Sequence, residues 1–156
     1  METIILRPHW KQFCITQLPF IILAAVTAGL APSGLFPLCW LLWFPALFLI
    51  TLLACHGLYL MRVRYVITEE QLIVHHGVLQ RSTDYMELYR VVDYRQHRTL
   101  MQQLAGLKTV TVYSGDRNTP QLDIPGIPQE YDVVRAIRER VEWNKRMKGI
   151  HELTNR

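Results

Sequence analysis

The sequence has no Asp, Glu, Lys or Arg between Lys11 and Arg62, a stretch of fifty residues. Residues 62–156 hold 27 of the 30 charged side chains and carry a net charge of +3. A single water-soluble globule spreads its charges over its whole surface, so the missing charges exclude that class. Glycine and proline, with eight residues each, are too few for a collagen-like or low-complexity chain.

Cysteine is scarce too, which excludes a disulfide scaffold. His56 follows a cysteine directly, but adjacent residues of a helix point to different sides and rarely share a metal ion. The adjacent pair His75 and His76 would face opposite sides of a strand, with the same consequence. We therefore expect no metal site and no cofactor. The three cysteines lie in or beside the uncharged stretch: Cys14, Cys39 and Cys55.

The sequence also lacks the motifs of several common enzyme classes. It contains no Gly-x-Ser-x-Gly, no phosphate-binding glycine loop and no dinucleotide fingerprint. A nucleophilic site needs a base held by a third group, and no such set is suggested. Nucleic-acid binding is not favoured, because +3 over 95 residues is mild and few aromatic side chains alternate with the basic ones. We expect a noncatalytic protein.

Two long apolar runs fill the uncharged stretch, at about residues 13–30 and 38–61. At about 1.5 Å per residue, the shorter run reaches about 27 Å, close to the thickness of a bilayer core. The turn-like residues 31–34 separate the two runs. The pattern predicts a transmembrane hairpin within residues 1–61. His56 alone does not make a proton relay, so we interpret the hairpin as an anchor.

The charges that flank the runs predict the orientation of the hairpin. Arg7 and Lys11 precede the first run, Arg62 and Arg64 follow the second, and the connection between them is uncharged. The positive-inside rule then places both termini in the cytoplasm, in a multi-pass protein of the inner membrane. A cleaved signal peptide is the alternative for the first run, with residues 26–28 as a small-residue cleavage site. The second run would then be the only anchor, with the C-terminal part still inside.

Residues 62–148 show the pattern of an α+β domain, with strands first and a helix last. Alternating apolar residues predict antiparallel strands, the last of them over 121–124. Residues 125–128 would end the sheet, because they contain two prolines. Thr99 and Gly106 have the residue types that begin and end a helix, which predicts a short helix between them. An amphipathic helix is expected over 129–148, followed by a flexible tail at 149–156.

Four segments in order after a transmembrane pair resemble a known family. The segments are 64–68 (RYVIT), 76–79 (HGVL), 90–93 (RVVD) and 104–112 (LAGLKTVTV). Together they resemble the bacterial pleckstrin-homology-like (PH-like) membrane proteins of the YdbS type. The resemblance implies a strongly bent antiparallel sheet of about seven strands, closed at one end by the last helix, and no enzyme chemistry. Gln103 departs from the family pattern, which usually has an arginine there.

The family has no agreed ligand, so candidate contact residues come from this sequence alone. Arginine is a planar donor that fits phosphate oxygens, and basic residues beside a span meet anionic headgroups. Our first hypothesis is a scaffold that holds a protein partner, or its own oligomer, at the membrane surface. The alternative is a sensor of anionic lipid headgroups. The possible headgroup or partner contacts are Arg62, Arg64, Arg95, Arg98 and Lys108.

Overall fold

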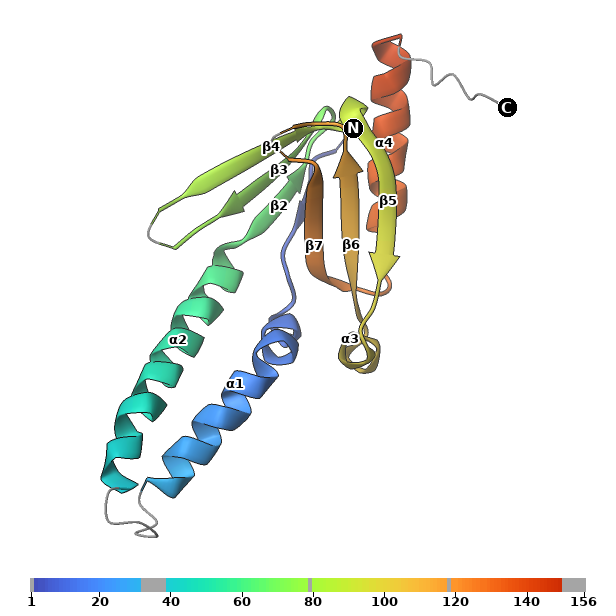
Figure 1. The fold of residues 1–156 in the computed structure, drawn as a ribbon. Helices are drawn as coiled ribbons and strands as arrows, with labels where there is room; N and C mark the ends of the chain where they lie inside the picture. Colours follow the sequence, from blue (N-terminus) through green and yellow to red (C-terminus); the bar gives the residue numbers. More distant parts are fainter. Residues whose placement is uncertain (1, 32–38, 79, 118, 150–156) are drawn as a thin grey trace.

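Two long N-terminal helices project from a β-rich unit, as Figure 1 shows. A computed structural model describes residues 2–31, 39–78, 80–117 and 119–149. The predicted α+β class is confirmed: two apolar helices precede two antiparallel sheets and a C-terminal helix. The helical elements are α1 (Trp10–Leu30), η1 (Cys39–Leu42), α2 (Trp43–Arg62), η2 (Leu88–Arg90), α3 (Leu100–Ala105) and α4 (Val133–Met147). The strands are β1 (Ile4–Leu6), β2 (Arg64–Ile67), β3 (Gln71–His76), β4 (Ser82–Glu87), β5 (Val91–His97), β6 (Leu107–Ser114) and β7 (Gln121–Pro128).

The helices α1 and α2 lie side by side. The first predicted apolar run lies within α1, and residues 39–61 of the second lie within η1 and α2. Each is long and apolar enough to cross a membrane, with a mean hydropathy of 2.0. Their large apolar side chains are mostly exposed, and the residues that α1 and α2 bury are Gln12, Ala24 and Ala46. Small residues such as alanine allow two helices to approach closely. The predicted turn at 31–34 lies, from residue 32 onward, outside the described residues.

The hairpin joins the sheets through short connections. Only Val63 separates α2 from β2, and its side chain is buried in the core. At the other helix, the backbone N–H of His9 donates to the carbonyl of Gly126 in β7, at 2.9 Å. The positive φ of Gly126 favours glycine, and a Cβ there would crowd Gln12. Both helices are therefore fixed to the β-rich unit where they leave it.

The first sheet has the strand order β1-β2-β3-β4, and all its pairs are antiparallel. Its first strand was not predicted, because three residues are too few to show an alternating pattern. Ile4–Leu6 pairs with β2, in the register Ile4↔Ile67. The residues before the hairpin thus form an edge of the sheet that follows it.

The second sheet has the order β5-β6-β7 and contains one correction to the sequence analysis. Residues 125–128 do not end the sheet but continue β7 as far as Pro128. Two prolines are tolerated there because β7 is an edge strand, where a missing N–H breaks no ladder on the open side. The predicted short helix is confirmed as α3. The Thr99 hydroxyl caps its start, and Gly106, with a φ of 70°, ends it.

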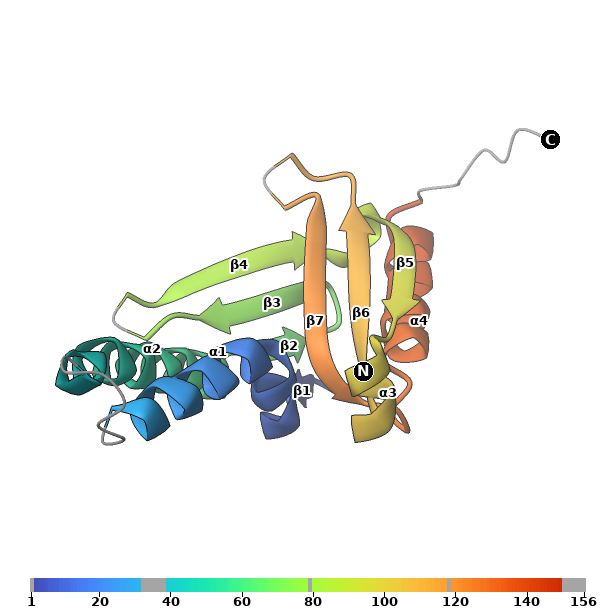
Figure 2. The ribbon, with the colours of Figure 1, turned by 60° about the horizontal axis from the view of Figure 1, so that its bottom comes forward.

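Figure 2 shows the strands of the two sheets crossing, with α4 beside β5. Residues of both sheets and of α4 form one buried core, which includes Leu72, Leu88, Val110 and Ile137. The helix α4 begins later than predicted, because the side chain of Asp132 caps it by accepting from the Arg135 N–H at 3.1 Å. Of the predicted tail at 149–156, residues 150–156 lie outside the described residues.

Candidate functional site

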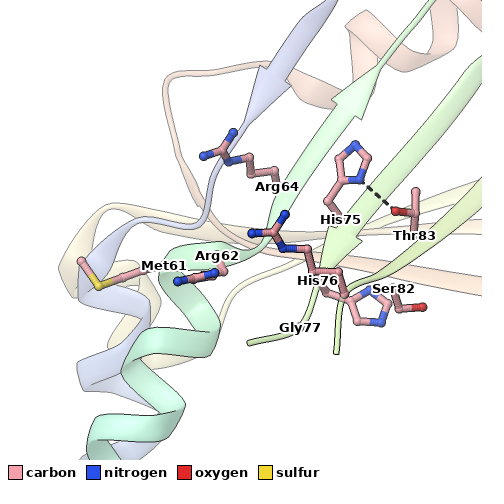
Figure 3. A pocket seen from close by; sticks show the side chains of 9 residues that line it. Met61, Arg62, Arg64, His75, His76, Gly77, Ser82 and Thr83 are labelled. Atoms are coloured by element: carbon pink, nitrogen blue, oxygen red, sulfur yellow. Dashed lines mark hydrogen bonds between the residues drawn. The ribbon is translucent and has the colours of Figure 1, made fainter. Parts of the chain in front are cut away.

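A pocket of about 520 Å³ opens where α2 meets the first sheet. Its walls come from the end of α2, the start of β2, the end of β3 and the start of β4, as Figure 3 shows. We call it the basic pocket, because arginines and histidines dominate its lining. Its polar lining residues are Arg62, Arg64, His75, His76, Arg81, Ser82 and Thr83.

The strand register places one row of the lining across three strands. Arg64 on β2 lies opposite His75 on β3, and His75 lies opposite Thr83 on β4. Directly opposed residues share a face of the sheet. The Nδ1 atom of His75 lies 3.1 Å from Oγ1 of Thr83, the contact drawn as a dashed line in Figure 3. Arg64, His75 and Thr83 thus occupy one row across three strands where α2 meets the first sheet.

The turn after β3 brings a third arginine to the pocket. Gly77 has a φ of 107°, in the region that favours glycine. A Cβ at this position would overlap the backbone oxygen of Gln80, so a larger residue does not fit. The tight reversal that glycine allows returns the chain to Arg81, which lines the pocket with Arg62 and Arg64.

The positive charge of the basic pocket is only weakly balanced. In the described part of the chain, no acidic side chain forms an ion pair with Arg62, Arg64 or Arg81. The nearest carboxylate contact is made by His76, whose Nδ1 lies 3.7 Å from Oδ2 of Asp84. Guanidinium groups donate planar pairs of hydrogen bonds that match phosphate and carboxylate oxygens. The pocket has the chemistry of a site for a phosphate-bearing anion.

The two histidines do not combine into a metal site. His75 contacts Thr83, while His76 lies near Asp84 on the opposite face of the strand pair. This is the arrangement expected for adjacent residues of a strand. Among the described residues, no group of three or more His, Cys, Asp or Glu side chains is placed to hold a metal ion.

The five residues predicted from sequence do not gather at one place. Arg62 and Arg64 line the basic pocket, whereas Arg95 and Arg98 are exposed on and just after β5, in the other sheet. Lys108 differs from the four arginines. The residue is only 4% exposed, and its Nζ donates to the carbonyl of Gln129 at 3.2 Å. The strand β6 is the central strand of its sheet and is buried on both faces over residues 107–112. In the structure, Lys108 is thus buried and hydrogen-bonded within the protein, unlike the four arginines.

Sequence reasoning missed Arg81. It considered His75 and His76 as a metal-binding pair, rejected that interpretation, and did not include them among the contact residues. The signal that could have revealed Arg81 was the β-hairpin formed by β3 and β4. If the chain is expected to turn back at Gly77, the end of β3 and the start of β4 lie side by side, next to the start of β2. The exact register that brings Arg64 to His75 comes from strand pairing, which the local pattern does not show.

An apolar groove of about 440 Å³ adjoins the basic pocket, between α1 and α2 near the sheets. Met61 lines both cavities, so the groove begins where the basic pocket ends. The groove passes Gly57, where the absence of a side chain leaves room beside the ring of Phe13. Arg7 lies in its lining as the one charged residue. A polar cavity and an apolar one thus share Met61 as a lining residue.

Tyr65 follows Arg64 on the strand and is buried in the core. Burial raises the pKa of its hydroxyl above the usual range, and Tyr59 and Asp123 add to the rise. Tyr65 therefore stays neutral near pH 7 and supplies no negative charge beside the basic pocket.

Comparison with known proteins agrees with the arrangement of elements described above. A family model described as a bacterial PH domain matches residues 15–141. The match covers most of α1, all of α2, the strands β2 to β7 and part of α4. No curated protein matches the chain, and no solved structure matches it.

Proposed function

Because the chain belongs to the bacterial PH domain family, we propose that it is a noncatalytic membrane protein whose basic pocket binds the phosphate of an anionic lipid. In this proposal, α1 and α2 span the inner membrane and both termini lie in the cytoplasm. The observation that carries the proposal is the group of three arginines at the end of α2 that no acidic side chain neutralises among the described residues.

The position of the basic pocket supports a lipid ligand over a free anion. Arg62 is the last residue of α2 and Arg64 the first of β2, so both lie at the end of a helix long enough to span the bilayer. This is the depth at which lipid phosphates lie when the helix spans the membrane. The protein then meets its ligand without leaving the membrane surface.

The apolar groove supports the same ligand class. A lipid combines a charged headgroup with a long apolar chain, and the two cavities that share Met61 offer matching surfaces in that order. Arg7 at the groove is a further donor at headgroup depth. A free phosphate would use the basic pocket and leave the groove without a role.

The test measures which lipids stay bound to the purified full-length chain, by native mass spectrometry in detergent. We expect phosphatidylglycerol adducts to be favoured over phosphatidylcholine adducts. Each arginine near a lipid surface contributes about 1 kcal/mol, so the triple variant Arg62→Gln, Arg64→Gln and Arg81→Gln should lose most of that preference. Inorganic phosphate added as a competitor separates the two anion sources.

The matched control removes the same charge elsewhere, with Arg135→Gln, Arg138→Gln and Arg146→Gln on the exposed face of α4. This variant should keep the preference of the wild type. If the pocket variant keeps its preference as well, or if both variants lose it equally, the basic pocket is not the headgroup site.

A scaffold is the second candidate function, and the edge of the first sheet favours it. The strand β4 ends the order β1-β2-β3-β4, so in the described part of the chain its outer edge pairs with no strand. An open edge accepts a strand from another chain through backbone hydrogen bonds. Tyr85 on β4 is exposed and offers such a partner an aromatic contact.

The mass of the protein extracted from crosslinked membranes tests the scaffold. A stable homo-oligomer, or one companion found in every preparation, is the expected result. A monomer with no reproducible companion would contradict the scaffold and leave lipid binding untouched.

A further inference from the structure

The outer face of α3 is apolar and exposed. Leu100 is 76% exposed, Met101 49% and Leu104 85%. By contrast, Leu72 and Leu88 in the β-rich unit are fully buried. Leu100 and Leu104 are four residues apart and so lie on one side of the helix. Large apolar side chains grouped on a surface mark an interaction site.

Buried hydrogen bonds hold α3 against the first turn of α1. The side chain of Gln102 is buried, and its Nε2 donates to Oε1 of Gln12 at 2.9 Å and to Oγ1 of Thr109 at 2.8 Å. A capping box between Thr99 and Gln102 completes the start of the helix. Because Gln102 turns inward, the apolar residues on the other side of α3 turn outward. Figure 1 shows α3 on the side of the β-rich unit from which the hairpin projects.

The surroundings of α3 match the interface of a membrane. Trp10 in the first turn of α1 is 67% exposed, and tryptophan is enriched where lipid meets water. Arg95 and Arg98 precede α3 and are exposed, and Lys11 follows Trp10. Apolar side chains flanked by basic ones are the composition of segments that lie in an anionic interface.

We propose that α3 inserts Leu100, Met101 and Leu104 into the interfacial layer of the leaflet beside the hairpin. The inference rests on the proposed membrane hairpin, and it does not depend on the basic pocket. The occupant is lipid because the bond between Gln12 and Gln102 links α3 to α1 just where α1 begins its apolar run, so α3 lies beside the point where the proposed hairpin enters the bilayer. With α3 in the membrane, the β-rich unit has a second contact that fixes its orientation on the bilayer.

Spin-label accessibility on the full chain, reconstituted in vesicles of phosphatidylglycerol and phosphatidylcholine, tests the proposal. The label is attached at Leu104→Cys, after Cys14, Cys39 and Cys55 have been replaced by alanine. Because the side chain of Leu104 is exposed, its replacement removes no core packing. Met101→Cys provides a second labelled position. Molecular oxygen concentrates in lipid, while a water-soluble nickel chelate is excluded from it.

The expected result at residue 104 is high collision with oxygen and low collision with nickel. Glu142→Cys, near the far end of α4, is the matched control and should show the reverse. Ile50→Cys, exposed on α2, reports whether the hairpin itself is in lipid. If residue 50 is in lipid but residue 104 meets nickel freely, the proposal for α3 is wrong while the membrane hairpin stands.

Two further outcomes overturn the proposal in different ways. Low collision with both reagents at residues 101 and 104 would mean that α3 contacts protein, either a partner or a second copy. Free access of nickel to residues 50 and 104 together would show that the hairpin does not span the bilayer, and the proposed membrane anchor would then fail along with the inference.

Discussion

The hairpin helices and α4 expose opposite kinds of residue. The helix α4 buries Val133, Ile137 and Val141 and exposes most of its charged side chains. The helix α1 buries Gln12 and Ala24 and leaves its large apolar side chains exposed. Both are regular helices of one chain, so the contrast reports the surroundings of each outer face. The outer face of α4 suits water, and that of the hairpin suits a medium in which apolar groups are stable.

The largest expected effect is on the free energy of unfolding, and it compares a residue packed in the core with one exposed on the hairpin. Ile137→Ala removes a fully buried side chain and should lower the free energy of unfolding of the β-rich unit by about 2–5 kcal/mol. Phe48→Ala, at an exposed position of α2, should change it little. Thermal unfolding of both full-length variants in detergent measures the difference. Equal losses would mean that α2 is packed as a core helix.

The next prediction compares an arginine placed on α2 with one placed on α4. Phe48→Arg puts a charge near the middle of the apolar run predicted at 38–61, at a cost of about 3 kcal/mol if that residue faces lipid. Trp143→Arg puts the same charge on the outer side of α4, where we expect almost no effect. The measurement is the fraction of protein that stays in the membrane after alkaline extraction. An unchanged fraction for Phe48→Arg would argue against a membrane-spanning α2.

The smallest expected effect on stability comes from Tyr65, which lies where the hairpin meets the β-rich unit, and it appears only at high pH. The folded state raises the pKa of Tyr65 above its unfolded value of about 10. Its contribution to stability is therefore full below about pH 10 and is lost as the pH rises beyond it, because the unfolded chain then releases the proton first. Tyr65→Phe should flatten this part of the curve of stability against pH. A slope as steep as that of the wild type would assign it to other groups.

The parts of the fold that are encoded locally were the predictable ones. The uncharged stretch predicted the hairpin, and Thr99 with Gly106 predicted α3 together with both of its ends. The strand β1 was missed because three residues are too few to show an alternating pattern, and because its partner strand lies some sixty residues away in sequence. The end of β7 was misplaced because prolines stop a central strand but not an edge strand.

The candidate site shows the same limit. Arg62 and Arg64 were predicted because they flank an apolar run, which is a local property. Lys108 was misplaced because alternation does not tell whether a strand is covered on both faces. Arg81 reaches the basic pocket through the reversal at Gly77 and the pairing of β3 with β4, neither of which a charge pattern shows.

The junction at Val63 determines how movement passes between the two regions. One buried residue joins α2 to β2, and the bond from His9 to Gly126 fixes α1 at a second point. Long helices tilt to match the thickness of their bilayer. Because both connections are short and anchored, a tilt of the helices should also tilt the attached sheets. If the hairpin spans the bilayer as proposed, the distance of Arg62, Arg64 and Arg81 from the lipid phosphates should change with the thickness of the membrane.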